Sequence, residues 1–375
     1  MSSQRYIPTL DGWRAIAVML VCCGHGFESV VGERHPVDGL WQLPMQGAAL
    51  GVRVFFGLSG FLITSRLLEE EQHLSRIDLP RFYWRRIFRI LPAAYTYLAL
   101  IGVLAIAGSV AIKPTSYAGA AFFFINYLHA GTRVTAHYWS LAVEEHFYLF
   151  WPVILVLAGR SQRLVVGAAL ACAITFWRAV DFGLSLTMSF EAHYPRTLWE
   201  GMQRTDLCVD FLLWGSVVAV LQGNQGWMRR FNSFAGTIAL ASATAIALVI
   251  AIPPAHQLKY AVINALLRPA VAGIAIALLL VSGSLRPGSM VGRLLESPPL
   301  RWLGRLSYSL YLWQQLFLTP EVSSQGWLAF LQHAPFNIAA ALGMALLSQQ
   351  WVEKPLIRFG ARWKRSNQHP AVLAR

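Results

Sequence analysis

Charged residues are scarce in this sequence. Asp, Glu, Lys and Arg make up only 13% of the 375 residues, whereas 56% are hydrophobic and the mean hydropathy is +0.48. So little polar surface excludes one or two soluble domains of this size and predicts an integral membrane protein. The net charge of +13 does not indicate a nucleic-acid partner, because the basic residues lie in short clusters between apolar runs, as in the cytoplasmic loops of membrane proteins.

Lysine and cysteine are equally scarce. Only four of the 31 basic residues are Lys, so arginine is the available cation for bidentate contacts with phosphate. The four cysteines, at positions 22, 23, 172 and 208, lie in apolar stretches without metal-ligand spacing. We interpret them as small core residues and expect no metal site. No repeat, low-complexity tract or long linker divides the chain, which predicts one membrane-embedded domain over residues 1–375.

Apolar runs of about twenty residues, the length that crosses a bilayer as a helix, define the expected architecture. An eleventh apolar stretch, residues 116–128, is shorter and is interrupted by Asn126. No small-residue cleavage site follows the first run, so we expect a retained first helix rather than a removed signal. We expect an all-α polytopic protein with ten transmembrane helices, near residues 8–28, 48–67, 88–112, 140–158, 162–180, 206–222, 234–252, 259–282, 304–320 and 328–350.

The distribution of arginines decides between ten and eleven spans. The positive-inside rule places the arginine-rich side of a membrane protein in the cytoplasm. With ten spans, one side holds both termini and most of the arginines, in segments 66–89, 159–163, 223–230, 284–303 and the tail 358–375. Eleven spans would break this pattern. We therefore expect 116–128 to be a re-entrant or interfacial segment that packs against protein or lines a cavity.

Ionisable residues interrupt the first apolar run. Asp11, Arg14 and His25 fall on one helix face, and the eleven residues from Arg14 to His25 correspond to about 16 Å. Ionisable groups in a membrane segment usually mark an ion path, a substrate site or a buried pair. For His25 considered alone, the alternative is a histidine that is bonded to a neighbouring helix.

Arginines also crowd the cytoplasmic end of the third span. Arg89 lies four residues after Arg85 and three after Arg86, so all three share one flank of a helix, where like charges repel unless an anion neutralises them. Contact with lipid headgroups explains such a cluster. A site for a phosphorylated cytoplasmic cofactor explains it equally well, because guanidinium groups match phosphate oxygens.

The fourth span begins with two adjacent carboxylates and a histidine, Glu144, Glu145 and His146. Neighbouring helix positions point about 100° apart, so the two carboxylates cannot serve one site equally. We expect one of them to face the protein interior and the other to meet the helix amino terminus, whose dipole favours a carboxylate. A functional role explains this cluster better than capping alone.

The second span carries small residues and a buried cation. Gly57, Ser59 and Gly60 allow either close helix packing or room for a substrate chain, and packing is the more common reason for them. Arg53, near the outer end of this span, is a candidate ion-pair partner for one of the two carboxylates of the fourth span.

Several stretches match a known pattern in order and cover nearly the whole chain. They are LDGWRAIAV (10–18) with His25, GVRVFF (51–56), LSGFLIT (58–64), FYWRRIFRILP (82–92), WSLAVEEHFY (139–148), RTD (204–206), LSYSLYL (306–312) and WVEKP (351–355). Together they resemble the acyltransferase 3 family, integral membrane proteins that O-acylate sugars and related hydroxyl compounds.

The resemblance implies a ten-helix bundle in a bacterial-type inner (plasma) membrane, with both termini in the cytoplasm. Such a protein takes an acyl group, commonly acetyl, from cytoplasmic acyl-CoA. The acceptor is a hydroxyl, often on an extracytoplasmic glycan and sometimes on a small molecule such as a macrolide. The resemblance further implies a catalytic role for His25 and binding of the CoA donor by Arg85, Arg86 and Arg89.

The sequence departs from the family pattern at two positions. Gln314 occupies a place where many members have His, and His146 follows Glu145 where Gln is usual. His146 is a candidate substitute for the missing histidine. Some relatives carry a soluble carboxy-terminal hydrolase-like domain; only about fifteen residues follow Phe359, so we expect no second extracytoplasmic step by this chain.

These residues suggest a mechanism. His25 would act as general base on the acceptor hydroxyl, with Glu144 or Glu145 fixing its tautomer and stabilising the imidazolium. Arg14, deeper on the same helix face, would guide the thioester or stabilise the developing oxyanion. A transient acyl-histidine is the variant, since imidazole is itself a nucleophile.

Substrate contacts and one rival function complete the expectations. For the RTD pair, a structural ion pair explains the sequence as well as a substrate contact does. The rival is a transporter or flippase in which Arg14, His25 and Glu145 form a proton or substrate relay. Repeated broken helices in two halves would favour it, and the sequence shows no such symmetry. The expected substrate-binding residues are Arg53, Ser59, Trp139, Arg204 and Asp206.

Overall fold

The structure, a computed structural model, describes residues 6–31, 43–128, 132–188, 203–251, 258–318 and 326–368. Every regular element in these ranges is a helix, which confirms the all-α class. The helices are α1 Pro8–Val31, α2 Leu43–Leu74, α3 Leu79–Ile106, α4 Pro114–Ala121, η3 Ile125–Tyr127, α5 Arg133–Ala136, α6 Tyr138–Leu157, α7 Gly159–Met188, α8 Thr205–Cys208, α9 Asp210–Gln222, α10 Gln225–Ala251, α11 Leu258–Leu285, α12 Met290–Leu295, α13 Pro298–Leu318, α14 Gly326–Leu331, α15 Phe336–Ser348, the π-helical η4 Gln349–Glu353 and α16 Lys354–Gln368.

Six helical stretches in the described part of the chain are long and apolar enough to cross a membrane: α2, α3, α5 with α6, α7, α10 and α11. The expected number of ten is therefore not reached on length and composition. Two of the other expected spans, α9 and α15, are only 13 residues long. The remaining two, α1 and α13, are long enough but carry polar residues such as Asp11, Arg14 and Gln314.

The stretch 116–128 forms only short helices. It contains most of the eight-residue α4 and the three-residue η3. At 1.5 Å per residue, α4 is about 12 Å long, far less than the hydrocarbon thickness of a bilayer. Ser116 and Asn126 are buried in this segment. Part of the segment therefore packs against protein, whereas Phe122 and Phe124 are exposed.

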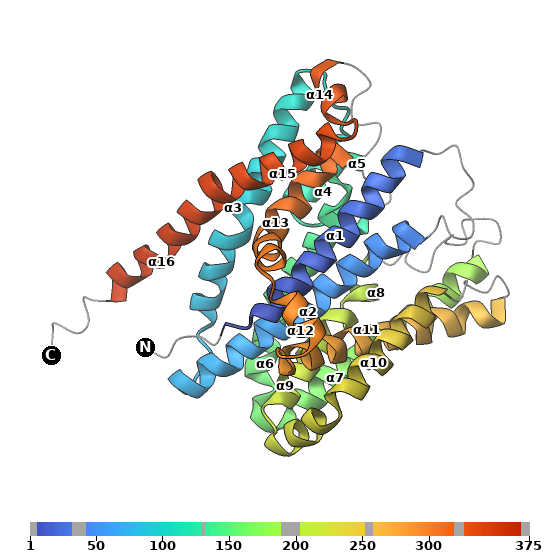
Figure 1. Cartoon of the computed structure of the whole chain (residues 1–375), viewed down its shortest axis with the longest axis vertical. Helices are drawn as coiled ribbons and strands as arrows, with labels where there is room; N and C mark the ends of the chain where they lie inside the picture. The colour runs from blue at the N-terminus through green and yellow to red at the C-terminus, as the bar shows by residue number, and fades with distance from the viewer. Residues whose placement is uncertain are drawn as a thin grey trace.

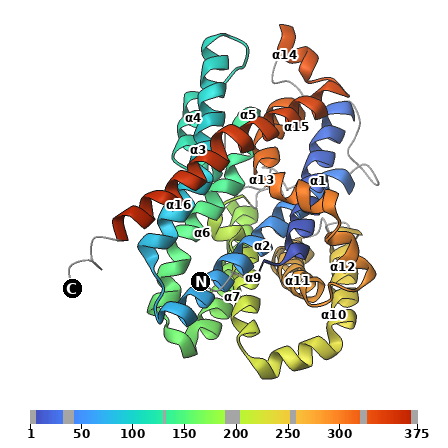
Figure 2. The same cartoon turned by 60° about the vertical axis from the view of Figure 1, so that its left-hand side comes forward.

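The centre of the bundle is formed by α1, α2 and α13. Helix α1 packs between α2 and α13, and α2 also packs on α9 (Figure 1). The long α10 and α11 pair with each other on one side of this centre, whereas α3 and α16 pack together on the other side (Figure 2). This arrangement places the motif-bearing parts of α1, α2, α3, α6 and α13 around one central volume.

Glycines bring α2 and α9 into backbone contact. A Cβ atom at Gly60 would lie 1.8 Å from the carbonyl oxygen of Leu212, and one at Gly215 would lie 2.3 Å from that of Gly57. Any larger side chain would force the two helices apart. The small residues of α2 thus serve close packing on the face toward α9.

A buried ion pair joins α7 to α9. Arg178 donates to Asp210 through both terminal nitrogens, at 3.0 and 2.7 Å, and both side chains are almost completely buried. Arg178 also donates to the carbonyl oxygen of Leu207 at 2.7 Å. Removing one partner of such a pair leaves a buried charge without compensation, so the pair fixes how α7 and α9 pack.

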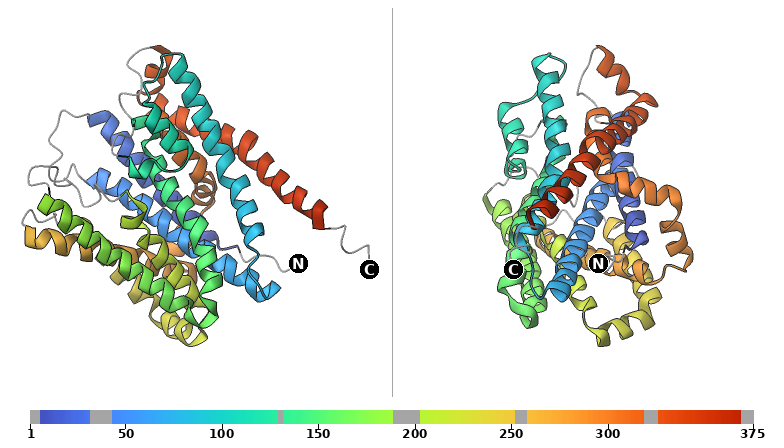
Figure 3. Two further views of the ribbon diagram at one scale, coloured as in Figure 1. Left: turned by 180° about the vertical axis from the view of Figure 1, so that it is seen from behind. Right: turned by 90° about the vertical axis from the view of Figure 1, so that its left-hand side faces the viewer.

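The helix ends gather at two opposite sides. The carboxyl end of α2 and the amino end of α3 lie together, far from the carboxyl end of α1 and the amino end of α2 (Figure 3). The turn between α2 and α3 is short. Asp78, its last residue, caps α3 by accepting a hydrogen bond from the backbone N–H of Arg81 at 2.9 Å. This side of the bundle carries the arginine cluster of α3.

Candidate active site

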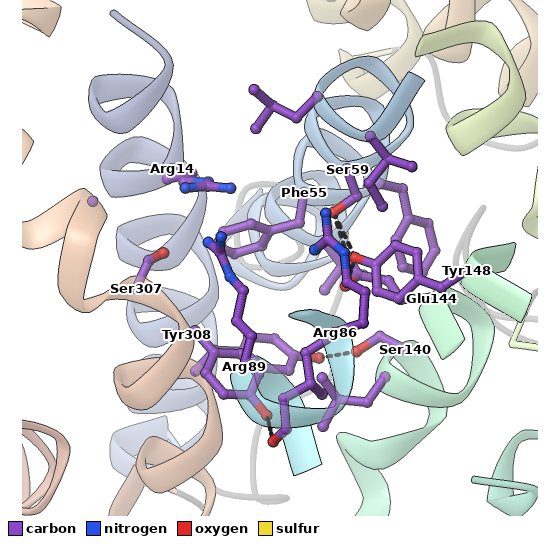
Figure 4. Close-up of a pocket in the computed structure, with 18 of the residues that line it drawn as sticks. Arg14, Phe55, Ser59, Arg86, Arg89, Ser140, Glu144, Tyr148, Ser307 and Tyr308 are labelled. Atoms are coloured by element: carbon purple, nitrogen blue, oxygen red, sulfur yellow. Dashed lines mark hydrogen bonds between the residues drawn. The ribbon is translucent and has the colours of Figure 1, made fainter. Parts of the chain in front are cut away.

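An arginine-rich cavity lies at the centre of the bundle, among α1, α2, α3, α6 and α13. Its volume is about 120 Å³. The guanidinium groups of Arg14 of α1 and of Arg86 and Arg89 of α3 point into it (Figure 4). The lining carries five guanidinium groups and one carboxylate, those of Arg14, Arg66, Arg86, Arg89, Arg305 and Glu144. We call this space the inner cavity. Such an excess of positive charge suits an anionic ligand.

A second cavity, of about 370 Å³, adjoins the first at the α2–α3 turn. The two share the side chains of Ile63, Arg66, Arg86 and Arg89, so they lie next to each other between the α2–α3 turn and the centre of the bundle. Helix α16 forms part of the wall of this outer space, which we call the donor cavity; its Gly360 accepts a hydrogen bond from Trp84 at 3.1 Å.

The structure brings together the three arginines that the sequence singled out. Arg86 and Arg89 line both cavities, and Arg85 lines the donor cavity alone. Arg85 forms an ion pair with Glu70 at 2.7 Å. The guanidinium of Arg86 lies over the ring of Tyr148, 4.9 Å from its centre. All three are thus placed where a phosphate-bearing ligand could meet them.

Glu144 is the carboxylate of the inner cavity. It accepts hydrogen bonds from Ser59 at 2.9 Å and from Tyr148 at 2.7 Å. Glu145 does not line the cavity, and its Oε1 atom is buried without a hydrogen-bond partner. The expectation that one carboxylate faces the interior describes Glu144. The expectation that the other meets the helix amino terminus is wrong, because α6 begins at Tyr138 and its first turn contains no acidic residue.

His25 bonds to Gln314, not to the carboxylates expected to fix its tautomer. Its Nδ1 lies 2.8 Å from Oε1 of Gln314. The amide nitrogen of Gln314 donates to the carbonyl oxygen of Tyr311 at 3.4 Å and to Oε1 of Gln315 at 3.2 Å. The amide oxygen is therefore the acceptor, and Nδ1 of His25 carries the proton. This tautomer leaves Nε2 as the basic nitrogen.

Ser59 and Trp139 lie close to the cavity in different ways. Ser59 lines it and bonds to Glu144. Trp139 lies outside it and stacks against Arg53, whose guanidinium is 5.2 Å from the indole centre and 5.3 Å from the ring of Phe211. Arg53 is 1% exposed. Its cation–π contacts join α2 to α6 and α9, so Arg53 stabilises the packing of these three helices.

Arg204 and Asp206 lie away from both cavities. They form an ion pair at 2.5 Å, and Arg204 also contacts Asp181 at 3.0 Å. Asp206 belongs to α8, which precedes the apolar helix α9. Burial raises the pKa of Asp206, but hydrogen bonds from Arg204 and Trp177 outweigh it, and the pKa falls below its usual value. This arrangement is that of a structural ion pair at the surface.

Some cavity residues escaped the sequence analysis. Arg66 was missed, although it follows Ser59 by seven residues, or two helical turns, and so shares its face. The α2 residues that line the inner cavity follow helical spacing: Val52, Phe55, Phe56, Ser59, Leu62, Ile63 and Arg66. Tyr148 and Tyr311 belong to stretches of the family pattern, but the sequence alone indicates no role for them in the site. Gln314 was noted only as a departure.

Comparisons with known proteins identify the family of this chain. Residues 7–347 match the family Acyl_transf_3, described as an acyltransferase domain. The "Peptidoglycan O-acetyltransferase OatA" of Listeria monocytogenes is 26% identical over 96% of this chain and 57% of its own length. The "Putative peptidoglycan O-acetyltransferase YrhL" of Bacillus subtilis is 28% identical over 96% of this chain and 56% of its own.

A "Putative O-acetyltransferase" of Staphylococcus aureus (strain COL) is 29% identical over 83% of this chain and 50% of its own length. The chain thus spans only about half the length of the curated relatives that it matches. No solved structure matches it. Since the family match extends over nearly the entire sequence, the chain belongs to the acyltransferase 3 family.

Proposed function

We propose that this protein is a membrane O-acetyltransferase that takes an acetyl group from acetyl-CoA and transfers it to a hydroxyl of an extracytoplasmic carbohydrate. One observation carries the proposal: seven arginines line two adjacent cavities that extend from the α2–α3 turn to Tyr311, one helical turn before Gln314, the partner of His25. Family membership and the names of the relatives favour acyl transfer over transport.

The proposed binding of acetyl-CoA rests on the positive charge of the two cavities. Acetyl-CoA carries several phosphate charges, and a chain with so few acidic residues offers seven arginines along the two cavities against Glu70 and Glu144. Each charge-assisted hydrogen bond between a guanidinium and a phosphate contributes about 1.5–3 kcal/mol. Phosphates held in the donor cavity would direct the pantetheine arm, which carries the thioester, toward the inner cavity.

The proposed activation of the acceptor hydroxyl rests on the tautomer of His25. With Nδ1–H donated to Gln314, the Nε2 atom takes the proton of the acceptor hydroxyl. The hydroxyl oxygen then attacks the thioester carbonyl, the C–S bond breaks, and CoA leaves as a thiol once protonated by the imidazolium. In the acyl-histidine variant, Nε2 itself attacks first and the hydroxyl takes the acyl group from it. Arg14 would stabilise the developing oxyanion.

The topology follows from the same reasoning. We infer ten spans, formed by α1, α2, α3, α6, α7, α9, α10, α11, α13 and α15, with both termini in the cytoplasm of a bacterial-type inner membrane. Arg76 between α2 and α3, Arg160 and Arg163 at the start of α7, and Arg229 and Arg230 at the start of α10 support this orientation. The acceptor lies on the opposite side, which agrees with relatives named for peptidoglycan O-acetylation.

Binding of acetyl-CoA to the purified protein in detergent tests the donor assignment. We expect saturable binding that an Arg85→Ala/Arg86→Ala/Arg89→Ala variant loses. The matched control is Arg229→Ala/Arg230→Ala/Arg293→Ala, which removes the same charge from exposed positions that line neither cavity. Loss in the first variant alone would support the proposal.

Two results would contradict it. Folded wild-type protein that binds no acetyl-CoA would point to another donor or to transport. Equal loss in both arginine variants would show that the effect is one of overall charge. His25→Ala serves as the second arm: transfer should disappear while donor binding remains, because His25 lies outside both cavities.

A further inference from the structure

The inner cavity ends on its outer side at a layer of three side chains. Phe55 of α2, Ser140 of α6 and Tyr311 of α13 all line the cavity, whereas His25, His137 and Gln314 do not. Ser140 and Tyr311 are 4% and 7% exposed, and Phe55 is partly buried, so the layer lies inside the bundle.

Direct contacts hold this layer together. The hydroxyl of Tyr311 and that of Ser140 form a hydrogen bond, and the Tyr311 hydroxyl also donates to the carbonyl oxygen of His137 at 3.3 Å. The ring of Phe55 meets the ring of Tyr311 edge to face, with centroids 6.0 Å apart. Helices α2, α6 and α13 are thus joined at one level.

The histidine layer lies one helical turn farther out. Gln314 follows Tyr311 by three residues on α13, and His137 precedes Ser140 by three residues at the start of α6, a rise of about 4.5 Å on each helix. The ring of His137 contacts Tyr311 from the outer side, at 5.9 Å between centroids. His25 belongs to this layer because it bonds to Gln314.

We propose that Tyr311, Ser140 and Phe55 form a closure between the donor-side cavity and His25, and that this closure opens for the acyl group to pass. The inference rests on the function proposed above. A closure of this kind keeps water and extracytoplasmic solutes from the thioester until the acceptor side is ready. Tyr311 is its central residue, because it bonds to Ser140 on one side and packs against His137 on the other.

Thiol labelling tests the closure without any assay of activity. Ser59, in the inner cavity, is replaced by Cys in a background in which Cys22, Cys23, Cys172 and Cys208 are Ala. A small, charged methanethiosulfonate reagent is applied to either face of sealed, oriented vesicles. We expect labelling from the α2–α3 face only. Adding Tyr311→Ala should raise the labelling rate from the opposite face at least tenfold.

Tyr308→Ala is the matched control. Tyr308 lines the same cavity three residues farther in, where its hydroxyl bonds to the carbonyl oxygen of Ile90. It should leave labelling from the outer face unchanged. Tyr311→Phe keeps the ring but removes the hydrogen bond with Ser140, so it should give an intermediate increase in the labelling rate from the outer face. Unlike Tyr311→Ala, this variant does not require the fold to tolerate a large cavity.

The closure would be refuted if Ser59→Cys were labelled equally from both faces with Tyr311 intact. Unchanged labelling in folded Tyr311→Ala would refute it as well. Hydrolysis of acetyl-CoA without acceptor, in which water attacks the thioester and releases acetate and CoA, should rise in Tyr311→Ala while transfer falls. If the wild type neither hydrolyses nor transfers but the labelling pattern holds, the proposed function fails and the closure stands.

Discussion

The hydrogen bond from His25 to Gln314 offers the sharpest test of the acceptor side. In Gln314→Leu, a side chain of similar size removes the amide oxygen that accepts from Nδ1 at 2.8 Å. A net hydrogen bond contributes about 0.5–1.5 kcal/mol, which corresponds to a factor of about two to thirteen in the population of the required tautomer. Loss of ring orientation adds to this, within the range of about 10²–10⁴ that general base catalysis supplies.

We therefore expect kcat for acetyl transfer to fall by about ten- to a hundredfold in Gln314→Leu. The KM for acetyl-CoA should stay within about twofold, because Gln314 lines neither cavity. Gln314→Glu retains an acceptor oxygen at this position and should recover most of the activity. The measurement is initial-rate kinetics with a soluble carbohydrate acceptor at saturating and limiting donor concentrations.

Gln315→Leu is the matched control for this experiment. Gln315 is the next residue on α13, is equally buried and donates to the carbonyl oxygen of Arg133 at 2.8 Å. Its Oε1 accepts a hydrogen bond from the amide nitrogen of Gln314 at 3.2 Å, but the carbonyl oxygen of Tyr311 still accepts from that nitrogen in Gln315→Leu. The orientation of Gln314 is therefore weakened and not lost, and kcat should fall by less than about threefold. Near-wild-type kcat in Gln314→Leu, or equal losses in both variants, would show that the amide does not position the histidine.

Three further predictions concern charge. Asp210→Ala should lower the free energy of unfolding by about 3–5 kcal/mol, seen as a large drop in melting temperature in detergent, because it strands a buried guanidinium; a change below about 1 kcal/mol would contradict this. Glu70→Gln should tighten acetyl-CoA binding by about two- to fivefold in a titration, because Arg85 would no longer have to break its ion pair with Glu70 before it binds phosphate. Weaker binding would show instead that Glu70 positions Arg85. The pKa of Asp206 is lowered from 3.8, so its pair with Arg204 stabilises the fold above that pH and is lost as the pH falls below it; Asp206→Asn should show a smaller loss of melting temperature between pH 5 and pH 3 than the wild type, and identical slopes would exclude this contribution.

The sequence predicted much of the fold and the clustering of arginines near the α2–α3 side, because both depend on local spacing. The helix class follows from long apolar runs. The convergence of Arg86 and Arg89 on one cavity follows from their three-residue separation on a helix, and the position of Arg14 follows from the first-span motif. Arg66 was equally predictable from its spacing to Ser59 and was overlooked.

The acceptor side could not be predicted, since it depends on the register between helices that are distant in sequence. Glu144 follows His137 by seven residues, or about 10 Å along α6, so it belongs to the cavity while the layer of His25 lies farther out. Nothing in the spacing within α6 reveals which of its residues is level with His25 of α1. The role of Gln314 was hidden for the same reason, because its partner is 289 positions away.

The distribution of charge indicates what an anionic ligand would contribute to this site. Elsewhere in the bundle the buried charge of Asp210 has a partner of opposite sign from the protein, Arg178. The inner cavity differs, because its lining holds five arginines and one carboxylate within the part of the chain that the structure describes. Concentrated like charges in a bundle are costly unless an anion neutralises them. A polyanionic donor would supply that neutralisation, and so its binding would stabilise the same helices that position its thioester below Tyr311.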